Sequence, residues 1–166
     1  QMKRHHPRLR LVGNLGLHSL NYGVNDDDIL RLIEWLDLDA IAFHLNPLQE
    51  SIQPEGQTDF SNLLPRLAAL TKKIGIPVWG KEVGNGISRS AYHRLSECGV
   101  AAVDLGGRGG TNWSRIEAKR AEAIGSKLQA RLGEAFRDWG LTTEESLRLL
   151  RADLAQDQAL PVIATG

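Results

Sequence analysis

Residues 38–50 read LDAIAFHLNPLQE, and this segment changes from apolar to polar about halfway along. The mostly apolar residues 38–43 are typical of a buried parallel strand, and Pro47 prevents that strand from continuing. The polar side chains that follow the apolar run are His44, Asn46, Gln49 and Glu50. Because a buried polar group without a partner costs roughly 1–3 kcal/mol, this concentration indicates a ligand or metal site. The alternative is a solvated polar loop.

Similar apolar stretches recur along the chain, separated by helical patterns. Strands are expected at residues 9–13, 38–44, 78–83, 100–105 and 160–164. Helices are expected after N-cap candidates Asn25, Ser88 and Thr142, from about residue 59 to 70, and over most of 116–139. Strands that alternate with helices require right-handed βαβ units, so the sequence predicts a parallel α/β sheet.

Two architectures would satisfy this alternation. A (β/α) barrel takes its catalytic groups from the carboxyl ends of several strands, whereas an open doubly wound sheet gathers its ligands mainly at one switch point. Polar groups follow several strands here, at Asn14, residues 44–50, Lys81 and residues 106–112, which favours the barrel. The five expected strands are nevertheless too few for the eight strands and about 250 residues of a complete barrel.

Composition narrows the class of protein. The chain has 166 residues, of which 42% are hydrophobic and 24% charged, as in one globular domain spanning residues 1–166. Lys plus Arg and Asp plus Glu number 20 each, so no net charge favours nucleic acid or an anionic membrane. The single cysteine, Cys98, excludes an intrachain disulfide, and no apolar run approaches the ~18 residues of a membrane span. We therefore expect a cytoplasmic protein.

Two further motifs offer charged or polar groups to a ligand. Lys81 ends a strand that is expected to be buried, so its ammonium must pair with a carboxylate or an electron-rich ligand. A structural Lys–Glu contact is the alternative. The glycine-rich turn at residues 106–110, followed by Thr111, offers free backbone N–H groups to an anion or to the polar edge of a ring cofactor. The alternative for this segment is a flexible turn.

The polar residues after the second strand differ in their chemistry. Glu50 provides hard oxygen ligands that suit Mg²⁺, although it could be a surface carboxylate. His44 could act as a general acid or base, could donate to a diphosphate, or could be a structural histidine. Gln49 is unusual, because an amide is a poor acid and a poor base.

Three blocks of motifs along the chain carry a family resemblance. The blocks are HLNPLQE (44–50) with QPEG (53–56), KEVG (81–84) with GIS (86–88), and DLGGRGGTNW (104–113) with IE (116–117). In this order they resemble type II isopentenyl diphosphate isomerase, over nearly the whole chain except residues 119–136. The resemblance implies a TIM (β/α)8 barrel, of which residues 1–166 would supply strands three to seven as the central segment of a single FMN-binding domain.

The resemblance also implies an activity and its residues. The expected reaction converts isopentenyl diphosphate to dimethylallyl diphosphate with reduced FMN, Mg²⁺ and NADPH as the reductant. Unpaired backbone groups on the outer strands of an incomplete barrel separately predict a homo-oligomer. Gln49 and His44 would be catalytic and would bind the substrate together with Asn46. The expected cofactor ligands are Asn14, Lys81 and Thr111 for FMN and Glu50 for Mg²⁺. The alternatives are another FMN-dependent barrel oxidoreductase, of the hydroxy-acid oxidase kind, and an inactive fragment of the isomerase.

Overall fold

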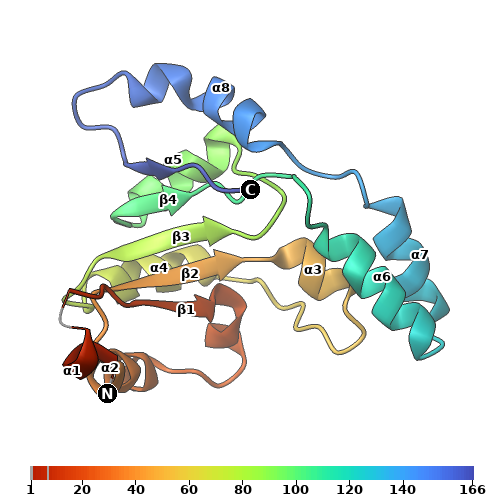
Figure 1. The fold of residues 1–166 in the computed structure, drawn as a ribbon, viewed down its shortest axis with the longest axis horizontal. Coiled ribbons are helices and arrows are strands. Elements are labelled where there is room, and N and C mark those ends of the chain that lie inside the picture. The colour runs from red at the N-terminus through yellow and green to blue at the C-terminus, as the bar shows by residue number, and fades with distance from the viewer. Residues whose placement is uncertain (1, 7) are drawn as a thin grey trace.

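A five-stranded parallel sheet forms the centre of the computed structural model, which describes residues 2–6 and 8–166 (Figure 1). The strands are β1 (Val12–Gly16), β2 (Ala40–Leu45), β3 (Val78–Glu82), β4 (Ala102–Asp104) and β5 (Val162–Ile163). They pair in chain order, and every pair is parallel. The predicted parallel α/β sheet is therefore confirmed.

One helix precedes the first strand, and the others lie between consecutive strands. The helices are α1 (Met2–His5), the 3-10 helix η1 (Leu17–Asn21), α2 (Asp26–Leu36), α3 (Pro47–Ile52), α4 (Leu63–Thr71), α5 (Arg89–Glu97), α6 (Trp113–Ala123), α7 (Lys127–Ala135) and α8 (Thr143–Leu154). The three predicted N-caps are confirmed, because the side chains of Asn25, Ser88 and Thr142 each accept a backbone N–H of the first helical turn. Among the described residues, no helix is both long and apolar enough to cross a membrane.

Several element boundaries differ from the sequence expectation. β1 starts at Val12, so Asn14 lies within the strand and not in a turn after it. The unpredicted helix α3 begins directly at Pro47, a position that suits proline because its fixed φ matches the first helical turn. The single long helix expected over residues 116–139 is two helices, α6 and α7. Gly125 separates them with φ of +77°, in the left-handed region that favours glycine.

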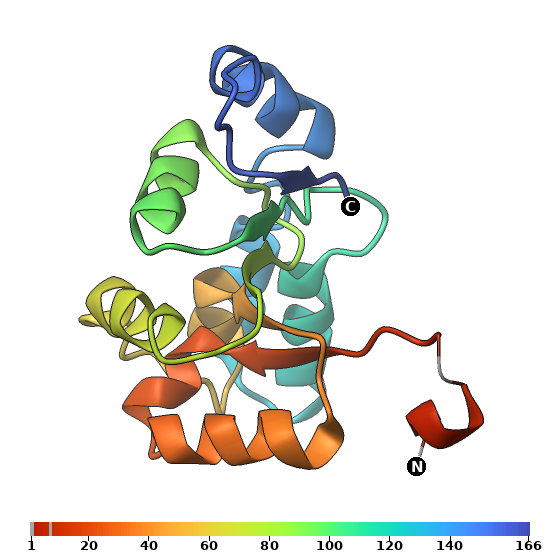
Figure 2. The ribbon, with the colours of Figure 1, turned by 90° about the vertical axis from the view of Figure 1, so that its left-hand side faces the viewer.

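The hydrophobic core lies between the sheet and the helices that follow one another around its outer side, α2, α4, α5 and α8 (Figure 2). Ile41, Phe43 and Val103 point into this core and are fully buried. Side chains alternate between the two faces of a strand, so their neighbours His44 and Asp104 point to the opposite face. Helices α3, α6 and α7 lie beyond the carboxyl ends of the strands (Figure 1).

The expectation of a TIM barrel is wrong. β1 pairs only with β2 and β5 only with β4, so the five described strands form an open sheet, whereas a closed barrel pairs every strand on both sides. The assignment to barrel strands three to seven fails with it. The polar strand ends do not distinguish the two architectures. An open parallel sheet with its strands in chain order brings all their carboxyl ends to one edge, as a barrel does. The two outer strands of this open sheet carry unpaired backbone groups, which favour pairing with another copy of the chain. A homo-oligomer therefore stays a prediction.

Candidate functional site

Polar side chains from adjacent strands lie side by side on the face of the sheet opposite the core. The register aligns His44 on β2 with Lys81 on β3, and Lys81 with Asp104 on β4. On the other side of His44, its Nδ1 lies 3.4 Å from Oδ1 of Asn14 on β1. Four consecutive strands therefore contribute to one polar row near the carboxyl ends.

Lys81 has a carboxylate partner in this row. Its Nζ donates to Oδ2 of Asp104 over 3.0 Å, and Asp104 is only 7% exposed. The other carboxylate oxygen, Oδ1, accepts from the Gly106 backbone N–H over 3.3 Å and from the Thr165 hydroxyl. The sequence correctly required a partner for this ammonium, but the partner is Asp104 and not a glutamate. Since an ammonium has three N–H donors, Lys81 keeps donors for a ligand.

A cavity of about 380 Å³ opens beside Lys81. Its lining residues come from the ends of β3, β4 and β5 and include Lys81, Glu82, Gly106, Gly110, Thr111 and Thr165. Close approach of two loops shapes this cavity, because a Cβ on Gly106 would lie 2.2 Å from the carbonyl oxygen of Glu82. The glycine-rich turn is thus required by packing and also lines an open space.

Buried Glu82 holds the loop after β3. Its Oε2 accepts the backbone N–H groups of Val83, Gly84 and Asn85 over 2.7, 3.0 and 2.8 Å. Burial raises the pKa of this carboxyl, and the three N–H groups oppose that rise. The main role of Glu82 is therefore to fix one wall of the cavity.

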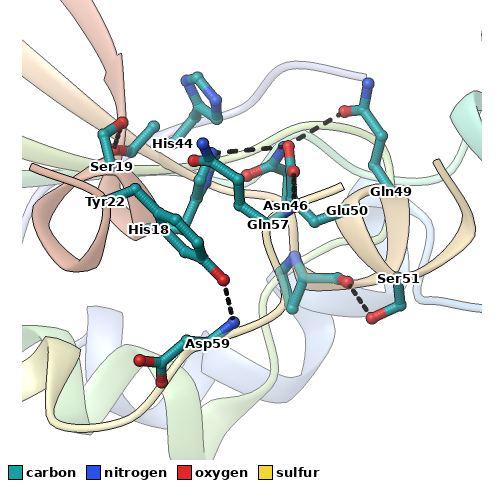
Figure 3. A network of polar contacts seen from close by, with 12 residues as sticks. His18, Ser19, Tyr22, His44, Asn46, Gln49, Glu50, Ser51, Gln57 and Asp59 are labelled. Atoms are coloured by element: carbon teal, nitrogen blue, oxygen red, sulfur yellow. Dashed lines mark hydrogen bonds and ion pairs between the residues drawn. The ribbon is translucent and has the colours of Figure 1, made fainter. Parts of the chain in front are cut away.

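A second polar group surrounds Glu50 in the first turn of α3 (Figure 3). Glu50 is 7% exposed, so the surface-carboxylate alternative is wrong. Its Oε1 accepts from Asn46 Nδ2 over 2.8 Å, and its Oε2 accepts from the Gln57 backbone N–H over 2.8 Å. His18 Nε2 lies 3.6 Å from the same Oε1. Because α3 starts immediately after β2, Asn46, Gln49 and Glu50 lie within one helical turn of each other.

Gln49 is held by a residue that sequence reasoning did not select. Its Nε2 donates to Oε1 of Glu117 on α6 over 3.2 Å, and Glu117 is 1% exposed. Arg120 donates to the other carboxylate oxygen of Glu117 over 2.5 Å. The IE motif at residues 116–117 was a signal for this residue, whereas nothing in the sequence pointed to His18.

His44 lies between these two groups. Burial is the main cause that lowers its pKa below the usual 6.5, since a partly buried imidazolium is poorly solvated. The positive charges of His18 and Lys81 lower it further, and Glu50 opposes them. His44 is therefore a neutral imidazole at neutral pH, with one ring nitrogen as donor and the other as acceptor.

The predicted site residues thus form two neighbouring groups joined by His44. The first contains Asn46, Gln49 and Glu50, and the second contains Lys81 and Thr111, which both line the cavity beside the glycine-rich turn. Asn14 is exposed, and its contact with these groups is the one between its Oδ1 and Nδ1 of His44. Within residues 2–6 and 8–166, no cluster of three or more His, Cys, Asp or Glu side chains could hold a metal ion.

The fold and the site define an α/β protein with polar side chains gathered at the carboxyl ends of its parallel strands. Comparison with known proteins gives a more particular likeness. The chain is 47% identical over 160 residues to a Synechococcus sp. protein named isopentenyl-diphosphate delta-isomerase. The aligned residues make up 96% of this chain and 44% of that protein. The chain is 44% identical over 166 residues to the protein of the same name from Hydrogenovibrio crunogenus, covering 100% of this chain and 47% of that one.

A third relative carries the same name. The Pyrococcus furiosus isopentenyl-diphosphate delta-isomerase is 45% identical over 166 residues, which covers 96% of this chain and 40% of that protein. The chain therefore spans less than half the length of these curated relatives. No protein-family model matches the chain.

Proposed function

We propose that this protein takes part in the isomerisation of isopentenyl diphosphate to dimethylallyl diphosphate. The observation that carries the proposal is the similarity, over nearly the whole chain, to proteins named for that reaction. The polar row and the Glu50 group support the proposal, because both lie at the carboxyl ends of parallel strands, where α/β proteins commonly bind their ligands.

His44, Asn46 and Gln49 are the proposed substrate-binding residues. A neutral His44 can donate one N–H to a diphosphate oxygen without carrying a charge of its own. Gln49 directs its Nε2 to Glu117, which leaves its Oε1 as the acceptor toward Asn46, 3.5 Å away. Because an amide is a poor acid or base, Gln49 is proposed to orient the substrate and not to transfer its proton.

Glu50 is the proposed Mg²⁺ ligand. Beside it, Asn46 Oδ1 and His18 Nδ1 are buried without a hydrogen-bond partner among the described residues. Unpartnered buried polar atoms next to a carboxylate are compatible with an additional polar species at this point. Mg²⁺ in proteins is commonly held by one or two carboxylates together with substrate phosphate oxygens, so the single carboxylate of Glu50 is sufficient when a diphosphate is bound.

Asn14, Lys81 and Thr111 are the proposed FMN-binding residues. The cavity beside the glycine-rich turn supports this, because it combines a cation held in place by Asp104 with a polar strand face. The Lys81 ammonium would stabilise negative charge on the polar edge of a reduced ring. When bound, FMN reduced by NADPH would supply a group able to accept and return a proton, which the amide side chains of Asn46 and Gln49 do not provide.

The test is to incubate the folded 166-residue chain with isopentenyl diphosphate, FMN, Mg²⁺ and NADPH and to measure dimethylallyl diphosphate. Product that depends on all additions supports the proposal. A flavin-loaded, folded chain that makes no product would contradict it. The visible absorbance spectrum after removal of free FMN separates the two parts of the proposal, because product without bound flavin would contradict the role of FMN alone.

A further inference from the structure

Three arginines line a second cavity, of about 280 Å³, beside the glycine-rich turn at residues 106–110. Arg108 comes from the turn itself, Arg115 from the first turn of α6, and Arg137 from the segment after α7. Gly109 and Gly110 line this cavity and the one beside Lys81, so the two cavities share a wall. The site proposed above does not use these arginines.

Asn112 brings the arginines together. Its Oδ1 accepts the Arg115 backbone N–H over 2.9 Å, and its Nδ2 donates to the Arg137 backbone carbonyl. This side chain therefore caps α6 and fastens the segment after α7 to the same point. The Arg108 backbone N–H donates to the Leu141 carbonyl over 2.8 Å, which anchors the third arginine. These contacts fix the backbone at all three arginine positions around the cavity.

The positive charges of this cluster are only partly balanced. Arg137 pairs with Glu134 over 2.7 Å and with Asp138 over 3.1 Å. Over the described part of the chain, no carboxylate lies within ion-pair distance of Arg108 or Arg115, and the buried Arg108 Nε has no partner. Asp138 also lines the cavity but pairs with Arg137, so the guanidinium groups of Arg108 and Arg115 repel each other without a counter-charge at ion-pair distance among the described residues. A bound anion would therefore stabilise the arrangement.

The backbone offers further donors at the same place. The N–H groups of Gly109 and Gly110 make no hydrogen bond to another described residue. The cavity also adjoins the amino end of α6, an eleven-residue helix whose dipole favours negative charge there. Guanidinium forks combined with free N–H groups match the several oxygens of a phosphate better than the two oxygens of a carboxylate.

We propose that this arginine cavity binds a phosphate or diphosphate group, at a site separate from Glu50 and Gln49. The inference does not depend on the proposed isomerisation, because it rests on the arginines, on the free N–H groups of the glycine-rich turn and on the amino end of α6. An anion here would lie against the glycine-rich turn and would help to fix the wall that this cavity shares with the cavity beside Lys81.

Titration of the ¹⁵N-labelled chain with inorganic diphosphate tests the proposal. We expect the Gly109 and Gly110 amide signals to shift on binding, and Arg108→Gln and Arg115→Gln each to weaken binding about tenfold, as for loss of one hydrogen bond to a charged group. Arg151→Gln is the matched control, since Arg151 is exposed on α8 and has no ion pair among the described residues. It should leave binding unchanged.

Equal weakening in all three variants would overturn the proposal, because it would indicate general charge attraction. Shifts that are abolished by Lys81→Ala and unaffected by Arg108→Gln would also overturn it, because the anion would then bind beside Lys81. Titrations with FMN and with riboflavin, which lacks the phosphate, identify the source of the group. Sensitivity to Arg108→Gln for FMN but not for riboflavin would assign the cavity to the phosphate of the flavin, and sensitivity for inorganic diphosphate alone would assign it to a separate anion.

Discussion

Gln49 on α3 and Glu117 on α6 are joined by a hydrogen bond of 3.2 Å between Nε2 and Oε1, across 68 positions of sequence. Glu117 is itself fixed, because Arg120 donates to its second carboxylate oxygen over 2.5 Å. The amide of Gln49 therefore has one defined orientation before any ligand binds. Such preorganisation matters because a polar group that must first be oriented contributes less to binding and to rate.

We expect Glu117→Gln to lower the rate of dimethylallyl diphosphate formation by about tenfold, since misplacing one positioning group has effects of this order or larger. The substitution keeps the size of the side chain but removes the negative charge that pairs with Arg120. Glu122→Gln is the control, because Glu122 is exposed on the same helix and, among the residues that the structure describes, forms an ion pair only with Lys119. A folded Glu117→Gln variant with an unchanged rate would show that the orientation of Gln49 is unimportant.

The two proposed cofactor groups should respond to different substitutions. Glu50→Gln removes the anionic oxygen and should raise the Mg²⁺ concentration needed for activity, while flavin binding stays intact. Lys81→Ala should instead weaken FMN binding, because it removes the cation beside Asp104. Mg²⁺ titrations of activity and fluorescence titrations with FMN measure the two effects. Full activity of Glu50→Gln at low Mg²⁺ would refute the metal assignment.

Gly107 and Gly110 lie in the same turn and should differ sharply in their tolerance of a side chain. A Cβ at Gly107 would lie 2.2 Å from the backbone nitrogen of Thr143, at the start of α8, whereas a Cβ at Gly110 would meet nothing within 4 Å. We therefore expect Gly107→Ala to destabilise the protein by about 1–3 kcal/mol, and Gly110→Ala to change stability by at most about 0.5 kcal/mol. Urea denaturation measures both, and equal effects would contradict the close packing of the turn against α8.

The sequence predicted those parts of the structure that depend on local chemistry. Capping by Asn25 and Thr142 was correct because an N-cap acts within three residues of itself. The polar groups after β2 were recognised because buried apolar runs and Pro47 mark the end of a strand. The same proline obscured α3, since a residue that stops a strand can also start a helix.

Contacts between distant segments were not predictable in this way. The partner of Lys81 is 23 residues away, and the partner of Gln49 is 68 residues away, so both depend on how the strands and helices pack. Barrel closure failed as an expectation for a related reason. The pattern of strands and helices predicts parallel neighbours, but whether the edges of a sheet meet depends on strand number, tilt and register, which no short segment encodes.

The lowered pKa of His44 makes stability depend on pH in a defined direction. Its folded-state pKa lies below the usual 6.5, mainly because of burial, so in mild acid the unfolded chain binds a proton that the folded chain does not. The stability that neutral His44 contributes is complete above pH 6.5 and is lost as the pH falls toward the folded-state pKa. Urea denaturation at about pH 7.5 and about pH 5.5 should therefore show a larger loss for the unmodified protein than for His44→Gln. His6→Gln is the control, because His6 is exposed and should leave the loss unchanged. If all three proteins lost the same stability on acidification, the protonation of His44 would not be governed by its burial and by the positive charge of Lys81.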